Sequence, residues 1–167
     1  MKKLLLLVFI LCSLMCNAKG KKSFFYDGIE LQNVRGWNII PSKDDNSTTI
    51  TGFTKKETLQ FRIVKQGVPK NFKAEAYLQN TVEKIMEANM ATSFDTPKIK
   101  EVSDIAEGFV NDIPAKYIDI TYTKKNAQRI YVFTMHNKLF TITCTGVGVK
   151  DASLVALFTD FVLRGFS

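Results

Sequence analysis

The chain has 167 residues and a formal charge of +7 at pH 7, and hydrophobic residues make up 46% of it. This length suits one domain, and thirteen phenylalanines can supply a packed core. A composition this apolar excludes intrinsic disorder for the bulk of the chain. The excess of basic residues would attract anionic lipid surfaces or acidic proteins.

The N-terminal segment has the pattern of a secretory signal. Two lysines follow Met1, residues 4–11 are uninterrupted apolar residues, and small side chains precede a cleavage point after Ala18. The apolar run is shorter than the roughly 20 residues that a membrane-spanning helix needs. We therefore expect three parts: a signal peptide (1–18), a polar tether (19–23) and a single domain (24–167).

Cys16 allows a second interpretation of the same segment, as a site of lipid attachment. Bacterial lipoproteins carry leucine and then two small residues before the modified cysteine, whereas Leu14 and Met15 precede Cys16. The sequence favours cleavage after Ala18, with acylation of Cys16 as the alternative. In either case we expect an exported bacterial protein, periplasmic or secreted.

Cleavage after Ala18 would leave Cys144 as the only cysteine of the mature chain, so no intramolecular disulfide could form. Cys144 lies in the apolar phase of a strand pattern with Phe140 and Ile142. This position predicts a buried and unreactive thiol.

The first third of the domain reads as strands. Asp27-Gly28 indicates a turn within the first of them, Pro41 indicates the end of the second, and residues 42–47 form a polar turn. The expected strands of this part cover residues 24–34, 36–42, 48–56 and 58–66.

The spacing of the apolar residues then changes from a period of two to a period of 3.6 residues. This change predicts a helix over 72–90 with Asn71 as its N-cap. Two short strand pieces follow over 98–111, and then three strands joined by short polar turns. These three form an antiparallel meander. Its expected strands are 115–123, 128–136 and 139–147, and the apolar face expected for the helix is Ala74, Leu78, Val82, Ile85 and Met86.

A second helix is expected over 150–167, with Asp151 as its N-cap and Gly165 as its C-cap. Since each helix has one apolar face, each must lie on a sheet. The fold class is therefore α+β, with an antiparallel β-sheet flanked by two main helices. The apolar stripe expected for the second helix is Leu154, Leu157, Phe158, Phe161 and Val162.

Three stretches of this sequence resemble the PsbP-like superfamily: "DGIELQNVRGWNI" (27–39), "DIPAKYIDITYT" (112–123) and "RIYVFTMHNKLFTITCTG" (129–146). The resemblance spans nearly all of 24–166, although Val34-Arg35 stands where that group more often has Tyr-Pro. It implies an α/β/α sandwich such as small bacterial envelope domains have. It implies no single activity, because known members mostly bind proteins, and no functional residue carries over.

The residue types that support catalysis are sparse. His136, the only histidine, lies at an expected hairpin tip with no orienting partner, which predicts an exposed turn residue. The densest carboxylate groups lack the spacing of a calcium loop, so we expect solvated turns and no metal or cofactor. These groups are Asp44-Asp45-Asn46, and Asp104 with Glu107 and Asp112.

The basic residues are spread over the tether and the expected turns, for example Lys55-Lys56 and Lys124-Lys125. No basic stripe alternates with stacking aromatics, which argues against nucleic-acid binding. Trp37 is the candidate anchor for a partner, although a tryptophan more often fills one end of a core.

The function that we expect is a non-catalytic module of the cell envelope, which binds a protein or a surface component through a sheet face or its rim. The alternative is a carrier of a small apolar or anionic ligand, held between the helix over 72–90 and the sheet. Met86 and Met90 would then give an adaptable wall. An enzyme that uses carboxylates alone ranks last.

Overall fold

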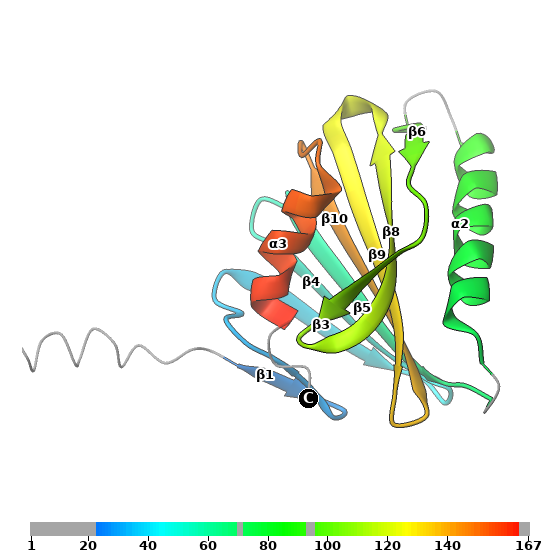
Figure 1. Ribbon diagram of the computed structural model, residues 1–167. Helices are drawn as coiled ribbons and strands as arrows, with labels where there is room; N and C mark the ends of the chain where they lie inside the picture. Colours follow the sequence, from blue (N-terminus) through cyan, green and yellow to red (C-terminus); the bar gives the residue numbers. More distant parts are fainter. Residues whose placement is uncertain (1–22, 70–71, 93–95, 164–167) are drawn as a thin grey trace, which may run out of the picture.

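The computed structural model describes residues 23–69, 72–92 and 96–163, and an eight-stranded antiparallel sheet forms its centre (Figure 1). The strand order is β3-β4-β5-β10-β9-β8-β6, and β7 also pairs with β8. The fold is α+β, as predicted. The sheet strands are β3 (Trp37–Lys43), β4 (Ser47–Thr54), β5 (Leu59–Gly67), β6 (Ile99–Val102), β7 (Ala106–Val110), β8 (Ile113–Tyr122), β9 (Asn126–Met135) and β10 (Lys138–Val147).

A β-hairpin and two α-helices pack around this sheet. β1 (Phe24–Tyr26) and β2 (Ile29–Leu31) form a separate hairpin, and the helices are α2 (Ala74–Met90) and α3 (Ala152–Leu163). The expected signal peptide with Cys16, most of the tether, Asn71 and Gly165 lie outside the described residues.

The predicted meander β8-β9-β10 is confirmed, and residues with positive φ make one tight turn inside it and another just before it. His136 and Asn137 join β9 to β10 with φ of 50° and 59°, and Asn111 and Asp112 join β7 to β8 with φ of 47° and 66°. Positive φ at both central residues is the backbone of a two-residue hairpin whose twist matches its strands.

The predicted turn at Asp27-Gly28 is also confirmed, since it joins β1 to β2. The expectation that Pro41 ends its strand is wrong, because β3 continues to Lys43. β3 is the edge strand of the sheet. A proline is tolerated there because a strand with one neighbour has N–H groups that no ladder requires.

One face of the sheet packs against both α3 and the β1–β2 hairpin. Its core contains Ile29 and Leu31 of the hairpin, Phe61 and Ile63 of β5, and the predicted buried Cys144 of β10. The backbone of β4 leaves space for the largest of these side chains, since a Cβ atom on Gly52 would lie 2.2 Å from Cζ of Phe61.

The stripe predicted for the second helix is wrong where the side chains are described. Val155 and Ala156 are buried, whereas Leu154 and Leu157 are 47% and 64% exposed. The reason is close approach: a Cβ atom on Gly146 would lie 2.5 Å from Cγ2 of Val155, so only small side chains fit between α3 and β10. The predicted cap is confirmed, since Oδ1 of Asp151 accepts a hydrogen bond from the backbone N–H of Ser153 at 2.8 Å.

The same predicted stripe includes Phe158, Phe161 and Val162. Their side chains are not among those that the structure describes.

The opposite face of the sheet packs against α2. Leu78 and Val82 are buried against Ile118, Ile130 and other apolar residues of β8 and β9. Met86 is 38% exposed, because it lies at the margin of the helical stripe that Leu78 and Val82 define. The N-cap is Lys73, which makes no side-chain capping bond.

Candidate functional site

The main candidate site is a place where two neighbouring strands separate. The ladder between β8 and β9 runs from Tyr122↔Asn126 to Lys116↔Val132 and stops there. Both strands continue further, β8 back to Ile113 and β9 on to Met135, each paired with its other neighbour. The two segments, 113–115 and 133–135, thus face a gap in the sheet.

Proline chemistry explains why the ladder stops. Met135 and Lys138 flank a two-residue turn and therefore form a hydrogen-bonded pair, so the next residue, Thr134, directs its N–H and C=O toward β8. In the same register its partner would be Pro114. Because proline has no N–H, this pair cannot exchange both hydrogen bonds, and the two strands separate.

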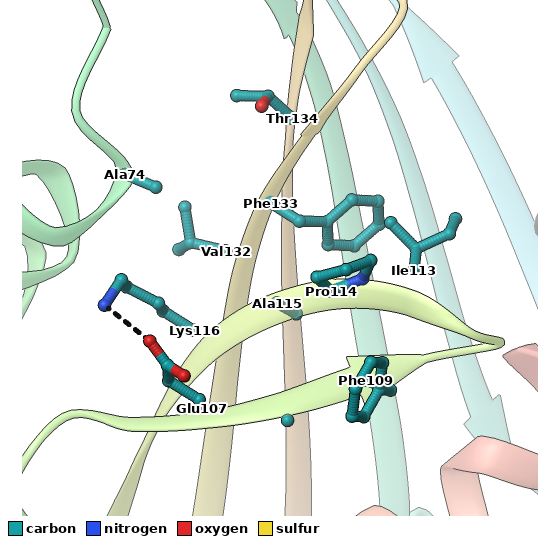
Figure 2. Close-up of a pocket in the computed structure, with 11 residues that line it drawn as sticks. Ala74, Glu107, Phe109, Ile113, Pro114, Ala115, Lys116, Val132, Phe133 and Thr134 are labelled. Carbon is teal, nitrogen blue, oxygen red and sulfur yellow. Dashed lines mark hydrogen bonds and ion pairs between the residues drawn. The ribbon is translucent and has the colours of Figure 1, made fainter.

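The gap opens into a groove of about 530 Å³ beside the start of α2, which we call the β8–β9 groove (Figure 2). In Figure 2 the side chains of Ala74 and Val132 face each other across it. Phe109 of β7 lies at its rim and is 66% exposed. Further lining residues are Glu107, Ile113, Pro114, Lys116, Phe133 and Thr134.

Charged side chains mark the end of the β8–β9 groove next to α2. Nζ of Lys116 lies 3.2 Å from Oε2 of Glu75 and 3.4 Å from Oε1 of Glu107. The hydrogen bond with Glu75, together with its charge, raises the pKa of Lys116. Two carboxylates thus share one ammonium group, which leaves an excess negative charge at this rim.

A second groove, of about 420 Å³, lies between α2 and the centre of the sheet, and we call it the helix–sheet groove. Thr81 and Ile85 of α2 form one wall. Its floor is polar, because Thr51, Arg62 and Thr143 form one row across three adjacent strands.

A chain of hydrogen bonds crosses the floor of the same groove. The hydroxyl of Tyr122 donates to Oε1 of Gln128 at 3.1 Å, and Nε2 of Gln128 donates to Oγ1 of Thr145 at 3.1 Å. Burial raises the pKa of Tyr122, so its hydroxyl stays protonated and remains a donor at neutral pH. This groove therefore presents hydroxyl, amide and guanidinium groups to a ligand.

A charged cluster lies on the α3 face. Nε and Nη2 of Arg129 donate to the two carboxylate oxygens of Asp119 at 2.6 and 2.7 Å, and its guanidinium carbon lies 4.1 Å from the ring centre of Tyr117. Nη2 also reaches Oγ of Ser153 at 3.2 Å, at the start of α3. These contacts occupy the guanidinium and join α3 to the sheet, so we assign the cluster a structural role.

A second charged cluster fastens the β1–β2 hairpin. The carboxylate of Asp27 accepts hydrogen bonds from Lys43, Lys65 and Thr48, and both lysine ammonium groups lie 2.7 Å from it. The hydrogen bonds with Lys43, Lys65 and Thr48, in that order, hold the pKa of the Asp27 carboxyl well below its usual range. This cluster connects the hairpin to β3, β4 and β5.

The structure places Trp37 and His136 away from both grooves. Glu107, expected in a solvated turn, instead lies in strand β7 and lines the β8–β9 groove. Trp37 packs its ring 5.1 Å from that of Phe61, on the α3 face of the sheet. Its role in binding a partner stays a prediction. His136 is exposed in its turn, as predicted. Asp44 organises its own turn, since Oδ1 accepts hydrogen bonds from the backbone N–H groups of Asn46 and Ser47.

Sequence reasoning missed the β8–β9 groove, although one signal for it was present. The strand was expected to begin at Ala115, after the proline, whereas β8 begins at Ile113 and includes Pro114. A proline inside an alternating pattern marks a position where the ladder on one side is interrupted.

A grouped metal site and a membrane-spanning helix are both absent from the parts of the chain that the structure describes. There, no three histidine, cysteine or carboxylate side chains are grouped so that they could hold a metal ion. Neither of the two helices described is both long enough and apolar enough to cross a bilayer.

The fold has counterparts among solved structures. The solution structure of cyanobacterial PsbP from Synechocystis sp. PCC 6803 has a TM-score of 0.53 at 14% sequence identity, with 87% of this chain and 89% of that chain covered. The fold is therefore PsbP-like. No protein-family model matches the sequence, and no curated protein matches it.

A crystal structure from Bacteroides thetaiotaomicron VPI-5482 is also similar, with a TM-score of 0.48 at 13% identity. It covers 88% of this chain and 47% of the other, so this chain spans about half of that protein's length. At such identities the likeness concerns the fold, and a site must be argued from its own residues.

Proposed function

We propose that this protein is an exported, non-catalytic domain of the cell envelope, with α2 and α3 on opposite faces of its sheet, and that it binds another protein through the β8–β9 groove. The signal pattern of residues 1–18 supports export. The observation that supports binding is the gap between 113–115 and 133–135, where two strands lack a mutual ladder beside the exposed ring of Phe109.

Two physical arguments connect this groove to binding. The ring of Phe109, which is 66% exposed, adjoins the apolar residues Ile113 and Pro114 of the groove, and contiguous apolar surface of this kind marks interaction sites. Backbone groups without a partner in the sheet also favour a ligand that supplies hydrogen bonds.

Site-specific cross-linking tests the proposal. Phe109 is replaced by the photoreactive p-benzoylphenylalanine in one variant and Ile40, which is 56% exposed on the edge strand β3, in a matched control. Irradiation of the native envelope should give a discrete protein adduct at position 109 and none at position 40. Equal adducts at both positions, or none at either, would refute binding through this groove.

A second candidate function is a carrier, and the helix–sheet groove favours it because it lies between α2 and the sheet. Met90 is 76% exposed and Met86 does not line this groove, so the expected methionine wall is replaced by Thr81 and Ile85. Arg62 supplies the positive charge that an anionic ligand requires.

Anilinonaphthalene sulfonate, an anionic apolar dye, is a suitable probe for the carrier function. Arg62→Gln should weaken dye binding several-fold, because it removes the guanidinium from the floor of the groove. Arg35→Gln, at an exposed arginine that does not line the groove, should leave binding unchanged. Equal affinities for the two variants would exclude the carrier.

We further propose that cleavage after Ala18 releases the domain and that Cys16 leaves with the signal peptide. Anchoring through Cys16 is the alternative, and a membrane-surface association of the basic chain would accompany it. The intact mass of the mature protein decides between them. Cleavage after Ala18 gives the mass of an unmodified chain that starts at Lys19, whereas anchoring gives a chain that retains Cys16 and carries the extra mass of a diacylglyceryl group.

A further inference from the structure

We propose that the partner presents a short extended segment to the β8–β9 groove and that this segment pairs, strand to strand, with Thr134 of β9. The inference rests on the function proposed above and specifies the chemistry of the partner. The segment carries an apolar side chain for the groove and a basic side chain for its rim.

The backbone of β9 supplies the first reason. Thr134 directs its N–H and C=O toward β8, and within the described residues no strand pairs with it on that side. The carbonyl of Pro114 faces the same gap, because alternate residues of β8 direct their backbone groups toward β9. An incoming strand can therefore exchange with Thr134 the two hydrogen bonds that Pro114 cannot exchange.

The walls of the groove supply the second reason. Cross-strand neighbours share a face, so Phe109 and Pro114 lie side by side, and Val132 lies on the same face of the sheet. A side chain of the incoming strand that points to this face meets apolar surface. Burial of that surface and backbone pairing together are the usual basis of peptide recognition by strand addition.

The charges at the rim supply the third reason and select the partner. Glu75 and Glu107 share the single ammonium group of Lys116. A lysine or arginine of the bound segment would compensate the remaining negative charge, whereas an acidic segment would be repelled. The chain as a whole is basic, so this preference for a cationic partner is a property of the groove and not of the net charge.

Pro114→Val tests whether the segment binds by strand pairing or by apolar contact alone. Valine supplies the missing N–H, so the ladder can extend to residue 114 and Thr134 and close the gap. We expect an unfolding temperature equal to or above that of the wild type and a loss of segment binding. Pro41→Val, the same substitution in the exposed edge strand β3 outside the groove, is the matched control.

The probe is a fluorescein-labelled, capped peptide of sequence KVKVKVK, measured by fluorescence anisotropy on the full mature chain. Pro114→Val should weaken its binding by about tenfold or more, the loss expected when two backbone hydrogen bonds are no longer available. Pro41→Val should bind within about twofold of the wild type, since residue 41 lies outside the β8–β9 groove and both of those hydrogen bonds stay available.

Two altered peptides complete the test. A version with N-methylated valines, which cannot donate from those positions, should bind as weakly as the parent peptide binds to Pro114→Val. EVEVEVE should bind more weakly than KVKVKVK, by a margin that shrinks at high salt.

Three results would overturn the inference: no binding of KVKVKVK to the wild type at about 1 mM, equal binding to Pro114→Val, or equal binding of the N-methylated peptide. If the adduct at position 109 persists in any of these cases, the groove still binds protein and strand pairing alone is refuted. If that adduct is also absent, the proposed function is refuted as well.

Discussion

The two faces of the sheet differ in how completely they are covered. On the α3 face, the β1–β2 hairpin and α3 bury Phe61, Ile63 and Cys144, and two charged clusters fasten these elements to the strands. On the other face, α2 buries Leu78 and Val82 over β8 and β9, and a groove remains on either side of that contact. Both faces bury apolar residues, and the two grooves lie beside α2.

The sequence basis of this difference is visible within single strands. In β5, Phe61 and Ile63 are buried on the α3 face, while the intervening Arg62 is exposed on the other. In β10, Ile142 and Cys144 alternate with Thr141 and Thr143. One face is therefore apolar and the other is rich in hydroxyl groups, although both belong to the same strands.

The largest expected effect concerns this alternation. Phe61→Ala should lower the free energy of unfolding by about 3–5 kcal/mol, because it leaves a cavity in the α3-face core. Arg62→Ala, one residue away on the opposite face, should change it by no more than about 0.5 kcal/mol. Urea denaturation of both variants measures the contrast, and similar losses would show that the faces do not differ as described.

The next effect concerns the charged cluster under α3. Asp119→Ala leaves the guanidinium of Arg129, whose side chain is 12% exposed, without its carboxylate. We expect a loss of about 2–3 kcal/mol in the same measurement. Asp104→Ala removes an exposed carboxylate as the control, and a loss as large as that of Asp119→Ala would contradict a special role for the cluster.

A smaller effect, visible in acid, concerns the β1–β2 hairpin. The pKa of Asp27 is depressed in the folded state, so its stabilisation is present above its ordinary pKa of 3.8 and is lost as the pH falls. Asp27→Asn should therefore make the free energy of unfolding less dependent on pH below about pH 4. Denaturation at several pH values measures how the free energy of unfolding depends on pH. The control Asp45→Asn should keep the pH dependence of the wild type. The same pH dependence in Asp27→Asn would disprove the stabilising role of the Asp27 carboxylate.

The smallest effect on stability is expected at the groove. Phe109→Ser should change the free energy of unfolding by about 0.5 kcal/mol or less, because the ring is already 66% exposed. Phe133→Ala, at a side chain that is 2% exposed, should cost about 3–5 kcal/mol. A large loss for Phe109→Ser would mean that this ring supports the fold and is not kept for binding.

The sequence by itself determined the order of the elements, the α+β class and the antiparallel meander. These features depend on local patterns, namely alternation with period two, a helical period of 3.6 and tight turns such as Asp27-Gly28. The same patterns predicted that Cys144 is buried and that His136 is exposed. Cys144 lies at an inward position of a strand, and His136 lies in a turn at the surface.

Only the tertiary structure decided which residues that are distant in the sequence contact each other. The pairing of Arg129 with Asp119, the contacts of Asp27 with Lys65 and the end of the β8–β9 ladder at Lys116 all depend on strand register, which no local period encodes. The close approach of α3 to Gly146 likewise selected Val155 over the leucines of the same helix. The grooves arise from such long-range geometry, since they form where strands separate and where a helix covers part of a sheet.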